Sequence, residues 1–296
     1  MASTPQQISA LLQLIDDPDE EVYGTVSEEL LHYGRAVIPR LEQLWEATED
    51  EDVQERIETL IHRVHFTDLQ EEFMEWARSP APEILRGAIL VARYQFPDLN
   101  VAAVINQFDK IRRNIWLELS PYMSPLEQIN VFNSILYSYC KLQGAELTER
   151  EPKHFFINQV LDSKQGNVYS LGVLYLALAE LLDVPIFAVD VPRQFVFAYI
   201  DTLRSFMAVD EDDVVQQIQF YIDPTNGSVY TQKDVDTYLR KINALDRDLY
   251  FVPMTAKRVI WKMLEELALC YRYRREEAKA EEIEQLMRVI VDDFGL

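Results

Sequence analysis

The fold is decided by residues 165–182, which read QGNVYSLGVLYLALAELL. From Leu171 to Leu182 the one charged residue is Glu180, and the apolar side chains cover nearly all sides of a helical projection. A helix that is apolar all round has to be buried on most of its surface. We therefore predict one long buried helix that begins near Val168 and lies inside its domain.

Runs rich in aromatic and β-branched residues follow this helix, and such runs predict strands. They lie at 186–190, 195–201 and 217–222, and a short fourth strand is predicted at 229–230. Runs of this kind are seen only after the helix. We expect these strands to form a small antiparallel sheet that packs against the helix and covers part of its apolar surface.

In the rest of the chain, the apolar residues recur at helical spacing. Residues 125–139 predict a helix before the central run, and helical periodicity returns from Lys233. The tail from Lys257 to Asp292 predicts two antiparallel helices, broken near Arg274-Arg275. The predicted fold class is therefore α+β and mostly helical.

Residues 6–115 carry a recurring helical pattern. Val22, Val53 and Ile84 follow one another at intervals of 31 residues, each at the start of a helical run. A second recurring segment lies at 38–41, 66–69 and 96–99, where we expect the second helix of each pair to begin. Pro39 and Pro97 are expected in the first turns of these second helices. The pattern resembles HEAT-like helical repeats, in which stacked helix pairs share a core. The alternative is an irregular helical bundle with chance spacing.

Three spaced motifs resemble a known family. They are Gly166-Asn167-Val168, Pro192-Arg193-Gln194-Phe195 and Tyr221-Ile222-Asp223-Pro224. In this order they resemble the transglutaminase-like superfamily, and most closely its SirB-type bacterial branch, over about residues 120–292. The recurring pattern at 6–115 and this resemblance together predict three domains. They are HEAT-like repeats at 1–118, a papain/transglutaminase-like α+β core with a small antiparallel sheet at 119–253, and tetratricopeptide-like helices at 254–296.

The resemblance also places a catalytic triad on this chain. Where the family reads Gly-Asn-Cys, its nucleophile falls on Val168, while its base falls on Gln194 and its acid on Asp223. Valine has no lone pair, and glutamine takes up no proton near pH 7. We therefore expect no catalytic residue here, and we predict that the three side chains lie side by side in a cleft. The same cleft is expected to be lined by Asn167, Tyr169 and Arg193.

Ser170 is the fallback nucleophile, because a branch of the family that lacks the cysteine keeps a serine at this position. A serine nucleophile needs a base within hydrogen-bond reach, and only His154 is near in the sequence. The competing interpretation is structural: Ser170 would bond the backbone near the start of the helix. For Asp223, the structural interpretation is that it bonds the amides of the turn at 223–227.

Composition and charge exclude several classes of function. With 28 Lys and Arg against 50 Asp and Glu, the net charge is −22, which repels nucleic acid and anionic membrane surfaces. Cys140 and Cys270 provide neither a disulfide framework nor a metal cluster, and we predict that they are small core residues. No cofactor and no metal are expected. The sequence starts without a signal-peptide pattern and its apolar run is too short to span a bilayer, so we expect a cytoplasmic protein.

Three functions stay open at this point. The first is a catalytically inactive transglutaminase-like protein that serves as a binding or scaffold module for a protein or peptide. The second is a hydrolase or acyltransferase with a displaced active site that uses Ser170 or another residue. The third is a helical-repeat adaptor for protein–protein interaction, whose middle domain spaces two helical arrays. The missing thiol and imidazole favour the first.

Overall fold

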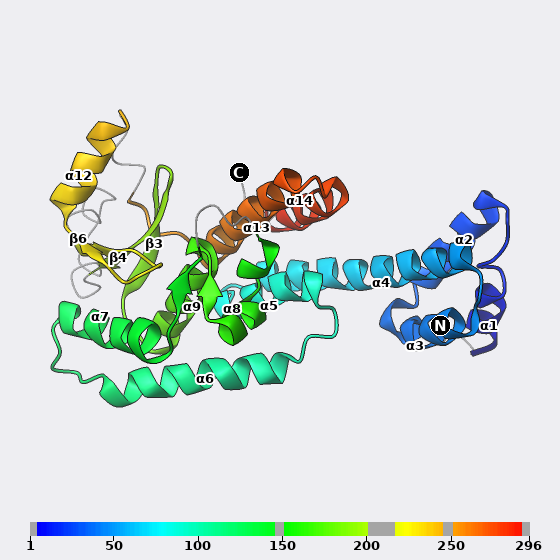
Figure 1. The fold of residues 1–296 in the computed structure, drawn as a ribbon, viewed down its shortest axis with the longest axis horizontal. Helices are drawn as coiled ribbons and strands as arrows, with labels where there is room; N and C mark the ends of the chain where they lie inside the picture. The colour runs from blue at the N-terminus through cyan, green and yellow to red at the C-terminus, as the bar shows by residue number, and fades with distance from the viewer. Residues whose placement is uncertain (1–4, 146–150, 201–216, 245–250, 292–296) are drawn as a thin grey trace. The chain divides into compact units, whose positions relative to one another are not determined.

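The structure is a computed structural model that describes residues 5–145, 151–200, 217–244 and 251–291. The chain separates into two compact units, Met1–Glu75 and Trp76–Leu296. Both are rich in helices, and Figure 1 shows the labelled strands in the second unit. None of the described helices combines the length and the apolar composition that crossing a membrane requires.

The first unit is a small helical array. Its elements are α1 (Pro5–Leu12), α2 (Glu20–Leu31), the 3-10 helix η1 (Gly34–Val37), α3 (Ile38–Ala47) and all but the end of α4 (Glu51–Arg78). Asp19 caps α2 by accepting from the backbone amide of Glu21 at 2.9 Å. The core of this unit includes Leu30, Leu41, Ile57, Leu60 and Val64, all fully or almost fully buried.

The second unit begins with helices. They are α5 (Ile84–Gln95), α6 (Val101–Glu118), α7 (Pro125–Asn133), the π-helix η2 (Ser134–Tyr139), the 3-10 helix η3 (Pro152–His154), α8 (Ile157–Ser163) and α9 (Val168–Leu181). After α9 the described elements are strands β3 (Ile186–Val191), β4 (Gln194–Ile200), β5 (Ile218–Ile222) and β6 (Val229–Tyr230), and helices α12 (Gln232–Lys241), α13 (Ala256–Tyr273) and α14 (Glu277–Val291).

The central helix is confirmed. Helix α9 begins at Val168, and every residue from Ser170 to Ala179 is buried. It packs against α5, α8, α13 and the first two strands of the sheet. At Gly172 the helix comes so close to β4 that an added Cβ atom would lie 2.5 Å from a ring carbon of Phe195. The apolar run is thus covered by a sheet on one side and by helices on others.

The sheet is confirmed as small and antiparallel, with strand order β3-β4-β5-β6. Its two faces have different neighbours. Phe195 and Phe197 point to α9, where their rings lie 4.9 Å from Tyr169 and 5.4 Å from Tyr175. The other face of the sheet forms a cluster with Val235 and Leu239 of α12. The predicted last residue of the second strand, 201, lies outside the described residues.

The structure corrects three expectations. Residues 66–69 begin no second helix, because α4 runs unbroken through them and contains no Gly or Pro that would end it. Pro97 lies between α5 and α6 instead of in a first turn, since Asn100 caps α6 by accepting from the amide of Ala103 at 3.1 Å. Strand pairing also precedes α9: β1 (Gln143–Gly144) and β2 (Gln165–Gly166) are parallel, and are too short for a periodic pattern.

The division after Glu75 differs from the predicted domain boundary after residue 118. Helix α5, which begins at Ile84, packs chiefly against α8, α9 and α13, and it therefore belongs to the core of the second unit. The tail forms the antiparallel helix pair α13 and α14 that the break near 274 predicted. The HEAT-like repeat and the three predicted domains stay predictions.

Candidate functional site

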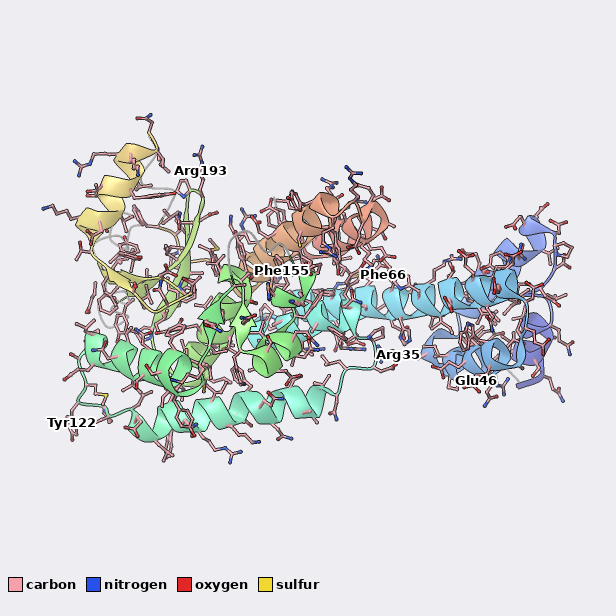
Figure 2. The ribbon with its side chains drawn as sticks, viewed as in Figure 1. Arg35, Glu46, Phe66, Tyr122, Phe155 and Arg193 are labelled. Carbon is pink, nitrogen blue, oxygen red and sulfur yellow. The ribbon has the colours of Figure 1, made fainter. Side chains whose placement is uncertain are left out.

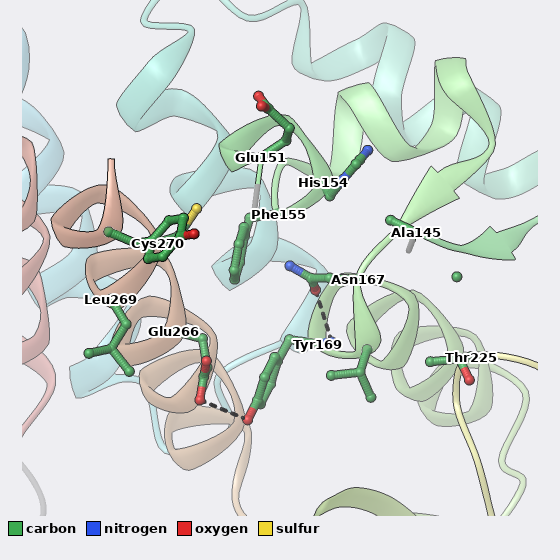
Figure 3. Close-up of a pocket in the computed structure, with 13 residues that line it drawn as sticks. Ala145, Glu151, His154, Phe155, Asn167, Tyr169, Thr225, Glu266, Leu269 and Cys270 are labelled. Atoms are coloured by element: carbon green, nitrogen blue, oxygen red, sulfur yellow. Dashed lines mark hydrogen bonds between the residues drawn. The ribbon is translucent and has the colours of Figure 1, made fainter. Parts of the chain in front are cut away.

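A cavity of about 510 Å³ opens at the N-terminal end of α9, inside the second unit (Figure 3). The start of α9 contributes Asn167, Val168 and Tyr169 to its lining. Helix α13 contributes Glu266, Leu269, Cys270 and Tyr273, and the segment around η3 contributes Glu151, His154 and Phe155. The cavity therefore joins segments that lie more than 100 residues apart in the sequence.

Local backbone chemistry places Val168 at the cavity. Strand β2 ends at Gly166, and the next residue, Asn167, caps α9. The side-chain oxygen of Asn167 accepts from the backbone amides of Tyr169 and Ser170, both at 2.9 Å. This cap fixes the first turn of the helix, so that Val168 is its first residue.

Ser170 is held away from the cavity. Its side chain is fully buried, and its hydroxyl donates to the backbone carbonyl of His154 at 2.6 Å. That bond reaches the backbone of His154, whereas base catalysis would need the imidazole. An added Cβ atom on Gly166 would lie 2.7 Å from the Ser170 hydroxyl oxygen, which shows how tightly the hydroxyl is enclosed.

Gln194 lies on the other face of the sheet from α9. It pairs with Val191 at the end of the β3–β4 hairpin, and paired residues of antiparallel strands share a face. Val191 belongs to the cluster beside α12, so alternation places Gln194 on that face and Phe195 on the α9 face. Gln194 is exposed, and Arg193 lies at the hairpin tip, where Figure 2 labels it. Neither of these two is among the residues that line the cavity.

Asp223 directly follows β5 and organises a turn. Its carboxylate accepts from the backbone amide of Thr225 at 2.8 Å and from the hydroxyl of the same residue at 2.5 Å. Thr225 itself lines the cavity. Asp223 is thus connected to the cavity through Thr225, on the side where Figure 3 labels that residue. The predicted side-by-side arrangement of Val168, Gln194 and Asp223 stays a prediction.

The electrostatics of the cavity centre on two carboxylates. Glu151 forms an ion pair with Arg274 at 3.0 Å, while Glu266 accepts a hydrogen bond from the hydroxyl of Tyr169 at 3.4 Å. Burial raises the pKa of the Tyr169 hydroxyl, and the negative charges of Glu266, Glu265 and Asp190 raise it further. Tyr169 therefore stays a neutral hydrogen-bond donor at every physiological pH.

Two residues at the cavity, Leu269 and Tyr273, were not predicted from the sequence, although the helical pattern of α13 gives a signal for them. Leu269 and Tyr273 are 49% and 67% exposed, and they lie four residues apart on one face of α13. The apolar stripe that buries α13 includes Met263, Leu264 and Leu267, so Leu269 and Tyr273 are apolar positions outside that stripe. Exposed apolar residues beside a cavity are typical of a binding surface.

The two cysteines differ in burial. Cys270 is buried and lines the cavity, and Cys140 is half-buried, with its pKa raised by that burial. Across the described ranges, no group of three or more His, Cys, Asp or Glu side chains is arranged to hold a metal ion.

Comparison with known proteins places this chain in a family. The family model for the transglutaminase-like superfamily matches residues 102–265. The chain is 24% identical to UPF0162 protein YchA of Escherichia coli K12 over 199 residues, which are 65% of this chain and 67% of that protein. It is 27% identical to a UPF0162 protein of Xylella fastidiosa strain Temecula1 over 115 residues, 38% of this chain and 40% of that protein.

A third relative is protein SirB1 of Salmonella typhimurium, 24% identical over 136 residues, 45% of this chain and 46% of SirB1. The matched part thus spans between two fifths and two thirds of the length of these curated relatives. No solved structure matches the chain.

Proposed function

This chain belongs to the transglutaminase-like superfamily, and we propose that it is a catalytically inactive member that binds a protein or peptide at the cavity beside α9. The observation that carries the proposal is the identity of Val168. It lines the cavity at the position where the resemblance puts the nucleophile, and its side chain has neither a lone pair nor a proton to transfer.

The surroundings of Val168 also support the loss of catalysis. Acyl transfer by a covalent route needs a nucleophile and a base within hydrogen-bond reach of each other. Ser170 donates its hydroxyl proton to a backbone carbonyl, and Gln194 is placed by strand alternation on the face away from α9. The retained Asp223 is engaged by Thr225 in a turn and has no imidazole to orient.

The rim of the cavity supports a binding role. Leu269 and Tyr273 are large side chains that remain exposed at its edge, and burying them against a partner removes apolar surface from water. A cavity of about 510 Å³ lies within the range of roughly 300–1,000 Å³ that is usual for ligand pockets. A peptide that inserts side chains there and covers the rim would use both features.

We expect no hydrolysis of amide or ester substrates above the rate in buffer alone. Single knock-outs of triad members in working enzymes cost roughly 10⁴–10⁶ in rate, and here both nucleophile and base are replaced. The measurement is release of a chromophore from p-nitrophenyl acetate and from a p-nitroanilide peptide, with wild type, Ser170→Ala and Cys270→Ala. Turnover that either substitution abolishes would establish a displaced active site and overturn the proposal.

The binding role predicts that selected peptides depend on the cavity rim. Peptides are selected from a displayed random library against the wild-type chain and are then tested on Leu269→Ser/Tyr273→Ser. We expect affinity to fall at least 10-fold, because two exposed apolar anchors are lost. The matched control is Trp116→Ser/Leu117→Ser on α6, which removes an aromatic and a leucine that are 62% and 69% exposed and lie outside the cavity lining.

In that control, binding should stay within twofold of wild type. If no selected peptide distinguishes the rim variant from the α6 variant, the cavity is not a peptide site and the proposed function fails.

A further inference from the structure

The carboxylate of Glu266 faces the cavity. Among the described residues it has one hydrogen-bond partner, the neutral hydroxyl of Tyr169 at 3.4 Å, which Figure 3 draws as a dashed line. Within the described part of the chain no Lys, Arg or His forms an ion pair with it. Glu151 differs, since Arg274 neutralises it at 3.0 Å. Glu266 is half-buried, so its charge is less screened than that of a surface carboxylate.

The other residues that line the cavity are suited to a ligand with a positive charge. The described lining includes no Lys and no Arg; His154 is its one basic side chain. Three aromatic side chains, those of Phe155, Tyr169 and Tyr273, surround the same space. The faces of aromatic rings attract cations, and the attraction is stronger where water is excluded.

The charge of the whole chain reinforces this sign. Near Tyr169, the carboxylate of Asp190 pairs with Lys262 at 3.0 Å and with Arg258 at 3.7 Å, so both of these cations are engaged with Asp190. The whole chain carries a net charge of −22, so the long-range field also favours a cation over an anion.

We propose that the cavity receives a Lys or Arg side chain of a peptide partner, with its cationic end at Glu266 and its apolar stem against Tyr169 and Leu269. Long basic side chains bury their methylene stems while the charged end meets a partner, which fits a cavity that has an apolar rim and one carboxylate. This inference rests on the proposed function, because it names the chemistry of the ligand at the same site.

The test uses three peptides that differ in one side chain: acetyl-Phe-Lys-Phe-amide and the same peptide with Gln or Glu in place of Lys. Dissociation constants are measured by chemical-shift titration at pH 8 and low salt. We expect the Lys peptide to bind about 10-fold more tightly than the Gln peptide, and the Glu peptide to bind most weakly. The preference for Lys should shrink as salt is raised.

Variants of the two adjacent carboxylates locate the effect. Glu266→Gln keeps an acceptor for the Tyr169 hydroxyl and removes the charge, so the Lys peptide should lose its advantage over the Gln peptide. Glu265→Gln is the matched control, because Glu265 is the half-buried neighbour that does not line the cavity, and it should change the affinity less than twofold.

The outcomes separate this inference from the proposed function. If the Lys peptide has no advantage over the Gln peptide, or keeps its advantage in Glu266→Gln, the cation site is refuted. In that case library peptides whose binding still depends on Leu269 and Tyr273 would leave the proposed function standing. Loss of rim dependence in the library experiment would refute both.

Discussion

Replacing Phe197 by Ala is expected to lower the free energy of unfolding of the second unit by about 3–5 kcal/mol. Phe197 is fully buried between the sheet and α9, where its ring lies 5.4 Å from that of Tyr175 and 5.8 Å from that of Phe195. The substitution removes apolar contact and leaves a cavity that α9 and β4 cannot close, because Gly172 already brings them together.

Calorimetry measures this effect as a fall of about 10 °C in the melting temperature of the second unit, given the size of that unit. Tyr122→Ala is the control. Tyr122 is 96% exposed in the segment between α6 and α7, where Figure 2 labels it, and its removal should change the stability by less than about 0.5 kcal/mol. Equal effects of the two substitutions would mean that the face of β4 toward α9 is not the core of this unit.

Replacing Gly227 by Ala is expected to cost about 2–4 kcal/mol, the second largest effect. Gly227 has a φ of 74°, a conformation that costs an L-residue about 1–2 kcal/mol. An added Cβ atom would also lie 2.2 Å from the side-chain oxygen of Asn133. Asn133 donates to the carbonyl of Gly227 at 2.7 Å and accepts from the buried hydroxyl of Tyr175 at 3.4 Å.

The alanine would therefore push Asn133 out of both bonds and loosen the turn that holds Asp223 and Thr225. Urea unfolding measures the loss. Gly24→Ala in α2 is the matched control, since nothing lies within 4 Å of an added Cβ atom there, and an alanine in a helix should be neutral or stabilising. A cost at Gly227 no greater than at Gly24 would contradict the role of this turn.

The central helix and the strands were predictable because their signal is local. An apolar surface on all sides of 168–182 requires burial, and runs of aromatic and β-branched residues at 186–190 and 217–222 require a pleated surface. The helix pair in the tail followed for the same reason, from apolar spacing and a break near Arg274. In each case neighbouring residues alone contain the information.

The errors arose where a local signal competes with a stronger one. Pro97 fits the first turn of a helix, but the side chain of Asn100 supplies the cap three residues later. Residues 66–69 resemble a helix start, yet α4 propagates through them because no residue interrupts its hydrogen bonds. Strands of two residues, such as β1, contain too few positions to show any period.

The sequence by itself determined the family and the α+β fold class, because the motifs, the apolar run and the strand patterns that indicate them lie within short segments. The assignment of the family's nucleophile and base positions to Val168 and Gln194 stays a prediction. Only the tertiary structure decided what surrounds Val168. Glu266, Leu269 and Tyr273 reach the cavity from a helix about 100 residues further along the chain. The physical reason is that a cavity is defined by packing between distant segments, and no periodicity or motif within one segment encodes which others it will meet.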